Sequence, residues 1–401
     1  MSGSMQTAEF LATVSSFPRL TRTEKIVLHA VWFNGSETRA EIGASTGLSR
    51  PTVIDAINGL RKRNLISAAR RKHGLIGRNP ECIVVNAEAL YGVGVDIGGT
   101  KTSTALVNLR GEIVAETTLP TIRKGPEALV DSVVQMKLHL LDSVGIDAQR
   151  VPFAAVGIPG VIQDNGWLLN TGTLEGLDSL DIRALFKDRL GCEVHLENDV
   201  NMAAYGELLD PASSFQGTRV LISVGTGLGM GIVHGGKVLR GARGHAGEIA
   251  YLPISADLQS PEARQHGAAE MLVSGPVLER RYFSLSGVRC TADQILQLRL
   301  ADDRYAVTAV DELVHHLARV VVSVVVTLDP EIVVMAGGLG SSPILHDLLM
   351  RAIEAISPLP VKLELARFGG RSGIVGATTY ACHYLEKLAM TGREGMANER
   401  P

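Results

Sequence analysis

The chain has 401 residues, of which 45% are hydrophobic and 20% charged, so it is longer than one small module and too apolar for wholesale disorder. Its net charge of −3 conceals two oppositely charged parts. Residues 1–90 hold twelve Lys/Arg against seven Asp/Glu, whereas residues 91–401 carry an excess of acid. A basic head on an acidic body predicts different binding partners for the two parts.

The cysteines and the hydropathy pattern indicate the compartment. None of the four cysteines has the close spacing that a structural zinc site or a redox pair needs, which favours a reducing, cytoplasmic setting. The most apolar run, 320–328, is about half of the ~20 residues that a membrane-spanning helix requires. No signal segment opens the chain, so we expect a soluble protein without a membrane partner.

The basic head has the pattern of a winged helix-turn-helix. Helical periodicity begins at Arg22, a second short helix ends at Gly47, and Ser49 caps a third helix. Two strands, expected at 66–71 and 82–85, then enclose a glycine-containing loop that predicts the wing.

The head also has the charge of a DNA-binding surface, because between Ala56 and Pro80 there are seven Lys/Arg and no acidic residue. The exposed start of the third helix would meet base edges through Ser49, Arg50, Thr52 and Asp55. The basic residues would contact backbone phosphates: Arg61, Lys62, Arg63, Arg70, Arg71, Lys72 and Arg78. A winged helix used only for protein contacts is the alternative. Paired DNA half-sites would require a homodimer or a higher homo-oligomer.

Three glycine-rich turns follow strands in the acidic body. The first, Asp96-Ile-Gly-Gly-Thr-Lys101, continues into a second strand rather than a helix, and the pattern returns around Gly225-Thr-Gly-Leu-Gly229. The body therefore looks duplicated, with two half-domains facing a cleft. A third turn, 336–340, suits the adenosine part of a nucleotide. The predicted nucleotide-binding residues are Asp96, which could hold Mg²⁺, and Gly98, Gly99, Thr100, Lys101, Gly225, Thr226, Gly227, Gly337 and Gly338. Tight packing of glycine turns is the alternative.

A polar turn, Glu197-Asn198-Asp199, follows a predicted strand and begins a helix. Asp199 could accept the proton of a sugar hydroxyl that attacks a γ-phosphate, while Asn198 holds another hydroxyl. A role in capping the helix explains the same residues equally well.

Together these motifs resemble the ROK family of repressors, unassigned reading frames and sugar kinases. The resemblance covers most of the chain: 96–101 is similar to the first phosphate motif, 157–160 to the sugar-side turn, 197–199 to the catalytic turn, 225–229 to the second phosphate motif and 335–338 to the adenosine motif. It implies an α/β chain in which a winged helix-turn-helix precedes an actin-like ATPase, ribonuclease H-like, duplicated body with two lobes around a cleft.

The resemblance also implies a sugar site made of Gly160, Asn170, Asn198, Asp199, Glu248 and Glu270. The family signature G-E-x-G-H resembles residues 247–251, but Tyr251 stands where relatives have a zinc-binding His. The three cysteines of the family's zinc loop are replaced by Pro261, Ala263 and Ala268. We therefore expect no zinc, and a sugar loop that is held differently.

A winged head joined to such a body is similar to the repressor branch of the family. We predict a sugar-responsive transcriptional regulator, with operator DNA and a sugar or sugar derivative as partners. The alternative is an ATP-dependent sugar kinase for a hexose or an N-acetylhexosamine, with Asp199 as base and Mg-ATP as cofactor. A protein-interaction scaffold would explain neither the turns nor Asn198. The expected parts are the winged head (1–88), two lobes (89–200 and 201–390) and a flexible tail (391–401).

Overall fold

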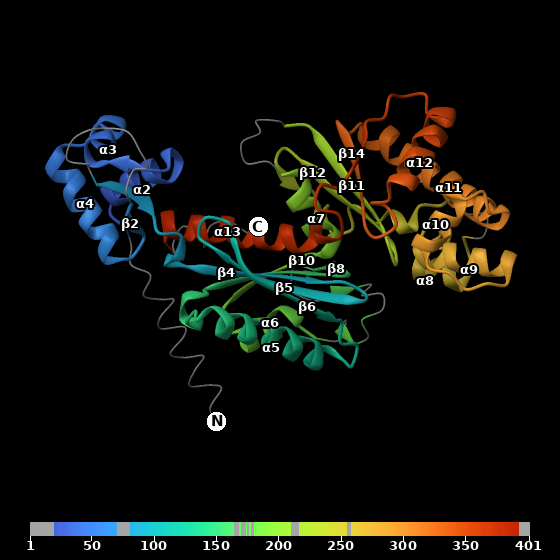
Figure 1. Ribbon diagram of the computed structural model, residues 1–401, viewed down its shortest axis with the longest axis horizontal. Helices are drawn as coiled ribbons and strands as arrows, with labels where there is room; N and C mark the ends of the chain where they lie inside the picture. Colours follow the sequence, from blue (N-terminus) through green and yellow to red (C-terminus); the bar gives the residue numbers. More distant parts are fainter. Residues whose placement is uncertain are drawn as a thin grey trace.

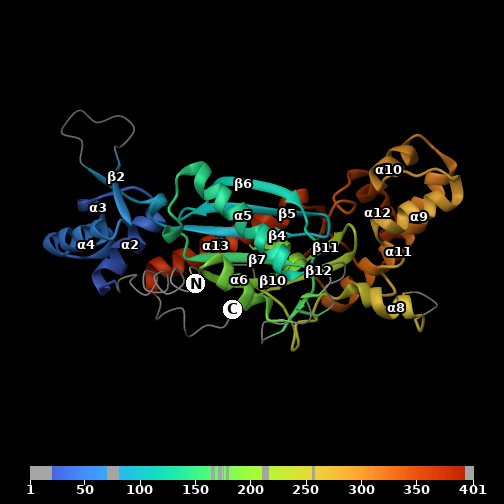
Figure 2. The ribbon, with the colours of Figure 1, turned by 90° about the horizontal axis from the view of Figure 1, so that it is seen from below.

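The computed structural model describes residues 20–69, 81–163, 168–169, 174, 176–177, 180–209, 216–254 and 258–392. Figures 1 and 2 place the N-terminal head at one end of an elongated molecule and helices α9 (Gly275–Ser286) and α10 (Ala292–Leu300) at the other. The two sheets of the body lie between these ends. In the described ranges no helix has the length and apolar character needed to cross a membrane.

The described part of the head contains helices and one antiparallel sheet with the strand order β1-β3-β2. Its elements are α2 (Arg22–Asn34), β1 (Glu37–Thr38), α3 (Arg39–Thr46), α4 (Arg50–Lys62), β2 (Ile66–Ala69) and β3 (Cys82–Val85). Each helix begins at a hydroxyl that accepts a backbone N–H: Thr21, Thr38 and Ser49. Three helices and two strands lie where the sequence predicted them, and their assignment to a winged helix-turn-helix stays a prediction. The loop 70–80 lies outside the described residues.

Helices α2 and α4 meet at Gly59 of α4. The buried Glu24 of α2 accepts a hydrogen bond from Arg63 Nη1 at 2.8 Å, and its other carboxylate oxygen accepts the N–H of Thr21 at 2.7 Å. A Cβ on Gly59 would lie 1.9 Å from Glu24 Oε1. Glycine at this position therefore makes room for the carboxylate that both caps α2 and ties it to α4.

Gly59→Ala is expected to destabilise the head by about 2 kcal/mol, because the new methyl displaces Glu24 and breaks its buried ion pair and cap. Gly43→Ala is the matched control in α3. Its Cβ would make only an ordinary contact, 3.6 Å from Leu48 O, so it should stabilise by up to about 1 kcal/mol through helix propensity. Trp32 fluorescence during urea unfolding measures both. A Gly59→Ala midpoint at or above that of the wild type would contradict this reasoning.

The body contains two five-stranded sheets with the same topology. The first has the order β10-β7-β4-β5-β6, with β4 (Tyr91–Ile97), β5 (Lys101–Asn108), β6 (Ile113–Pro120), β7 (Phe153–Ile158) and β10 (Glu193–Asn198). The second has the order β13-β12-β11-β14-β15, with β11 (Thr218–Val224), β12 (Leu228–His234), β13 (Lys237–Val238), β14 (Ile332–Ala336) and β15 (Leu363–Leu365). In both, an antiparallel meander is followed by two strands added in parallel beside the first strand. The predicted duplication is confirmed.

Helices cover these sheets, and a two-stranded ribbon, β8 (Val161–Ile162) with β9 (Leu168–Leu169), extends from the first. The first lobe has α5 (Pro126–Val144) and α6 (Ile182–Leu190) on one face. The second lobe has, besides α9 and α10, α8 (Pro261–His266), α11 (Arg304–Leu328) and α12 (Pro343–Ile356). Val320, Val321, Val324 and Val325 of α11 are buried in the core of the second lobe.

Helix α13 (Ser372–Thr391) leaves the second lobe and packs on the first sheet, opposite α5 and α6 (Figure 1). The expected second lobe, 201–390, therefore needs correction, since its last helix belongs to the first. Small residues of β4 explain the packing: a Cβ on Gly92 would lie 2.9 Å from Ala381 Cβ, and one on Gly94 would lie 2.7 Å from Thr378 Cγ2. Only a strand without side chains on this face can accept the helix so closely.

Helix α7 (Asp199–Leu208) lies between the lobes and crosses α13 with direct backbone contact. A Cβ on Gly206 would lie 2.6 Å from Gly376 N, and one on Gly376 would lie 1.8 Å from Met202 O. Neither glycine can be replaced without separating the two helices.

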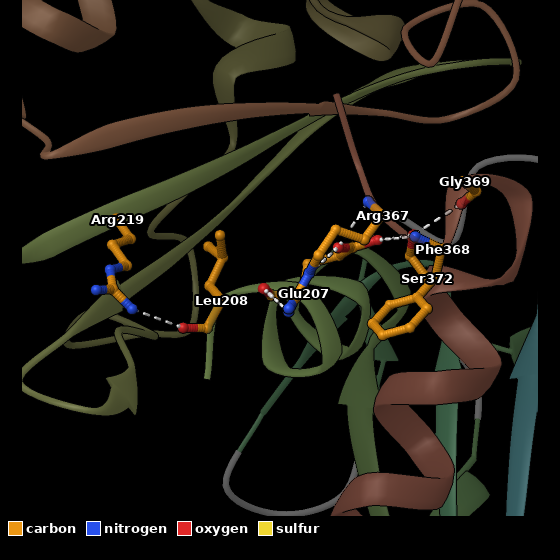
Figure 3. A network of polar contacts seen from close by, with 7 residues as sticks. All are labelled: Glu207, Leu208, Arg219, Arg367, Phe368, Gly369 and Ser372. Carbon is orange, nitrogen blue, oxygen red and sulfur yellow. Dashed lines mark hydrogen bonds and ion pairs between the residues drawn. The ribbon is translucent and has the colours of Figure 1, made fainter. Parts of the chain in front are cut away.

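Glu207, near the end of α7, fixes the chain that enters α13 (Figure 3). Its buried carboxylate accepts the backbone N–H groups of Arg367, at 3.0 Å, and Phe368, at 2.8 Å, and the Ser372 hydroxyl at 2.7 Å. The side chain of Arg367 also donates, from Nη2 to Glu207 O at 2.9 Å. Because its hydrogen-bonding capacity is used, this carboxylate acts as an anchor for the crossing between the lobes.

The core of the head continues into the first lobe and α13. Buried side chains of the head, such as Val85, belong to one cluster with Leu109 of the β5–β6 turn and Leu385 of α13. In the same turn, Arg110 donates to Trp32 O at 3.1 Å and lies over the Trp32 ring. The head is thus packed on the body rather than tethered by a free linker.

Candidate functional site

A cavity of about 310 Å³ lies where the two lobes meet, and many of the predicted site residues line it. These are Gly99, Gly160, Asn198, Asp199, Gly225, Thr226, Gly227, Glu248 and Glu270. Lining residues that sequence reasoning missed include Ser223, Met230, Gln265 and His266. These residues belong neither to the glycine-rich turns nor to the polar turn, and only the packing of the two lobes brings them to the cavity. Asn170 lies outside the described residues.

Asn198 and Asp199 form the start of α7 at one side of this cavity. Asn198 Oδ1 accepts the N–H groups of Val200 and Asn201, at 3.0 and 3.1 Å, and its Nδ2 donates to Gly160 O at 3.1 Å. The capping role is therefore present, and it ties the catalytic-type turn to the predicted sugar-side turn. Asp199 Oδ1 accepts the N–H of Val200 at 3.0 Å. Asp199 is one of the residues that line the cavity.

Burial raises the pKa of Asp199 to about 7, and the nearby charges of Asp96 and Glu248 raise it as well. Burial likewise raises the pKa of Asp96 to about 6, against the opposing effect of Lys101. A carboxyl with a pKa near 7 suits a group that accepts a proton at neutral pH.

Asp199→Asn is expected to raise the free energy of unfolding by about 1–3 kcal/mol near pH 8. The folded-state pKa of about 7 exceeds the ordinary value of 3.8, so the wild type loses stability as pH rises through this window, whereas the amide stays neutral. The gap should shrink as pH falls and vanish near pH 4. Urea unfolding at several pH values measures it, with the exposed Asp188→Asn as control. A gap that does not change with pH would be inconsistent with a raised pKa.

The second glycine-rich turn connects β11 and β12 and is bonded from several sides. Gly225 N donates to Gly227 O at 3.0 Å, and Gly225 O accepts Gly275 N at 2.7 Å. Leu228 N donates to Glu270 Oε2 at 2.9 Å. Glu270, predicted as a sugar ligand, is therefore attached to a predicted phosphate turn.

The third turn lies beside the second. Gly338 N would be 3.6 Å from a Cβ on Gly225, so the two turns are neighbours. Gly337 has a φ of 85°, and a Cβ there would lie 2.5 Å from Val224 O. Close packing therefore accounts for Gly337, while Gly338 is open to solvent.

The first turn is a tight hairpin between β4 and β5, closed by Gly98 N donating to Lys101 O at 2.9 Å. Of its residues, Gly99 reaches the cavity, while Thr100 and Lys101 are exposed on the hairpin. Arg123, which sequence reasoning missed, donates to Gly99 O and brings a positive charge to the turn.

An ion pair joins the lobes beside the catalytic-type turn. Arg240, in the loop after β13, donates through Nε to the buried Glu197 Oε2 at 2.7 Å, and Asn201 Nδ2 donates to Oε1 at 3.1 Å. The carbonyl of Arg240 accepts the N–H of Ala246, in the loop that carries Glu248, at 3.0 Å. Because the partners are far apart in sequence, no local pattern could have predicted this pair.

The segment that resembles the family's zinc loop in sequence is held by contacts within the chain. Among the described residues, no group of three or more His, Cys, Asp or Glu is arranged to hold a metal ion. Tyr251 instead donates through its hydroxyl to Gln265 O at 3.2 Å, and Ala269 N donates to Ala250 O at 2.9 Å. Gly267 packs so closely that a Cβ there would lie 2.3 Å from Ala250 O. The residues present do not fit a zinc ion, and direct contacts hold the loop.

In the head, the predicted base-reading residues Ser49, Arg50 and Asp55 are exposed at the start of α4, and Thr52 is partly exposed. Arg61 forms an ion pair with Glu81 at 2.7 Å. Arg63 is held by Glu24, so its expected phosphate contact must compete with an internal partner. Lys62 is exposed at the end of α4. The remaining predicted phosphate contacts, Arg70, Arg71, Lys72 and Arg78, lie outside the described residues.

The chain belongs to the ROK family, whose model matches residues 92–383. Over 83% of this chain and 85% of the relative, it is 24% identical to the xylose repressor of Bacillus spizizenii. Over 71% of this chain and 97% of the relative, it is 26% identical to the N-acetyl-D-glucosamine kinase of Pasteurella multocida.

Among solved structures, the chain is similar to a ROK family transcriptional regulator described as a homologue of the E. coli MLC protein. The TM-score is 0.70 at 20% identity, with 93% of this chain and 97% of the other covered. That coverage extends well beyond the family model and includes part of the head. The predicted α/β fold, with N-terminal helices preceding an actin-like ROK body, is confirmed.

Proposed function

We propose that this protein is a sugar-responsive transcriptional regulator that binds operator DNA through its head and a sugar through the cavity between its lobes. One observation carries the proposal: a continuous series of packed elements joins the two. Helix α7 begins at the cavity with Asp199, crosses α13 at Gly206, and α13 shares a core with the head. A change at the cavity can therefore reach the DNA-binding helix through rigid contacts.

The chemistry of the cavity supports a sugar. Its volume of about 310 Å³ suits a small molecule, and the side chains of Asp199, Glu248 and Glu270 offer acceptors for several hydroxyl groups. The similarity to a repressor named for xylose supports the same class of ligand.

The head supports operator DNA as partner. Arg50 and Asp55 are exposed at the N-terminal end of α4, where a recognition helix presents side chains to base edges. One such head covers a small site, so we propose a homodimer that binds paired half-sites in the cytoplasm.

The test is DNA binding by the full chain, with an operator selected from a randomised oligonucleotide library. One sugar from a panel of pentoses, hexoses and N-acetylhexosamines should change the DNA affinity by about tenfold or more, as a coupling of 1–3 kcal/mol requires. Arg50→Ala should weaken binding about tenfold. Arg351→Ala, an exposed arginine of α12, is the control. A DNA affinity that no sugar changes would refute the proposal.

A second function, sugar phosphorylation, is favoured by Asp199. Its pKa is raised to about 7, and it lines the same cavity as Gly225 of the second glycine-rich turn. A sugar hydroxyl would attack the γ-phosphate of Mg-ATP, its proton would pass to Asp199, and the bond to ADP would break. The similarity to a sugar kinase supports this chemistry.

ADP release with Mg-ATP and the same sugar panel tests this second function. A kinase should show sugar-dependent release that rises with pH through about 7 and falls about a hundredfold or more in Asp199→Asn, because the amide cannot accept the proton. No sugar-dependent release, or release that survives this substitution, would exclude phosphorylation with Asp199 as base.

A further inference from the structure

Glu270 accepts a hydrogen bond from a backbone N–H of the second glycine-rich turn. Its Oε2 accepts the N–H of Leu228 at 2.9 Å, and a Cβ on Gly227 would lie 2.6 Å from the same oxygen. Glu270 also lines the cavity. A single carboxylate therefore touches both the ligand cavity and the turn between β11 and β12.

A carboxylate in this position opposes phosphate binding. Turns of this type bind anions through backbone N–H groups that point at the ligand. Here one of those groups is already paired with a negative charge from within the chain. A phosphate at Gly225–Gly227 would have to displace Glu270 or lie beside it, and two like charges at such short range in a partly buried site repel strongly.

The position of Glu270 is linked to the loop that faces the proposed sugar. The backbone N–H groups of Ala269 and Glu270 both donate to Ala250 O, at 2.9 and 3.3 Å. Ala250 lies two residues after Glu248, which lines the same cavity. A ligand that moves or hydrogen-bonds this segment therefore also acts on the carboxylate of Glu270.

We propose that Glu270 is a gate for nucleotide phosphate. While Glu270 holds the Leu228 N–H, phosphate is excluded from the turn, and a hydroxyl ligand that binds Glu270 in the cavity opens the turn. The proposal rests on the nucleotide role proposed for residues 225–229. By linkage, the sugar and the nucleotide must then raise each other's affinity through this residue.

A purely structural role of Glu270 makes a different prediction. If the carboxylate only supports the turn, its removal should leave nucleotide binding unchanged or weaken it. If it is a gate, loss of its charge should strengthen binding. Glu270→Gln separates these roles because the amide oxygen can still accept the N–H of Leu228.

The experiment is calorimetric titration of ADP into the full chain, without sugar and without DNA. Glu270→Gln should bind ADP about tenfold or more tightly than the wild type. Glu270→Ala, which frees the Leu228 N–H, should also bind more tightly and serves as the second variant. Glu262→Gln, an exposed carboxylate of α8, should match the wild type. Equal or weaker binding by Glu270→Gln, or no detectable binding by any of these proteins, would overturn the proposal.

A second titration tests the opening of the gate. The sugar that changes DNA affinity should raise the ADP affinity of the wild type, and this increase should disappear in Glu270→Gln. An equal increase in both proteins would show that the sugar acts on the nucleotide through another route. Since the first titration uses neither sugar nor DNA, its failure is distinguishable from failure of the proposed regulator function.

Discussion

The crossing of α7 and α13 is the contact on which the arrangement of the molecule depends. Its backbones touch at Gly206 and Gly376, so no flexible side chain separates the helices. Glu207 then fixes the chain that enters α13, and α13 shares a core with the head. Packed backbones cannot adjust continuously, so a shift of α7 must either be resisted or be passed to α13 as a whole. A displacement of Asn198, which caps α7 at the cavity, would therefore also act on α13.

Several carboxyl groups line the cavity, and their ionised forms destabilise the folded protein. Burial raises the pKa of Asp199, Glu248 and Glu270 alike, which means that each carboxylate costs stability when ionised. Glu197 differs, since Arg240 and Asn201 satisfy its buried oxygens. The first three line the cavity, where a bound ligand can pair them. Glu197 instead joins the two lobes through Arg240.

Local signals predicted the fold well. Ser49 caps α4, Gly47 ends α3, and the repeated strand–turn–strand pattern predicted the two equivalent sheets, because caps, turns and hairpins depend on neighbours in sequence. The contacts that define the site are not local. Glu270 with Leu228, Arg240 with Glu197, and Arg63 with Glu24 each join residues 39 or more positions apart. The resemblance to a family predicted that Glu270 binds the sugar, whereas the structure shows that Glu270 accepts a hydrogen bond from Leu228 N. Asn198 has the capping role considered for it and also donates to Gly160 O, while its role as a sugar ligand stays a prediction.

Hydrogen bonds within the chain hold the segment that resembles the family's zinc loop. A metal ion with several protein ligands stabilises a loop by many kcal/mol, whereas the net contribution of each hydrogen bond to stability is about 1 kcal/mol. Here the loop is held by contacts of the second kind, from Tyr251 to Gln265 and from Ala269 to Ala250. Such a loop can exchange its own hydrogen bonds for those of a ligand at small cost. Because Glu270 belongs to the same segment and accepts the N–H of Leu228, such an exchange would also act on the second glycine-rich turn.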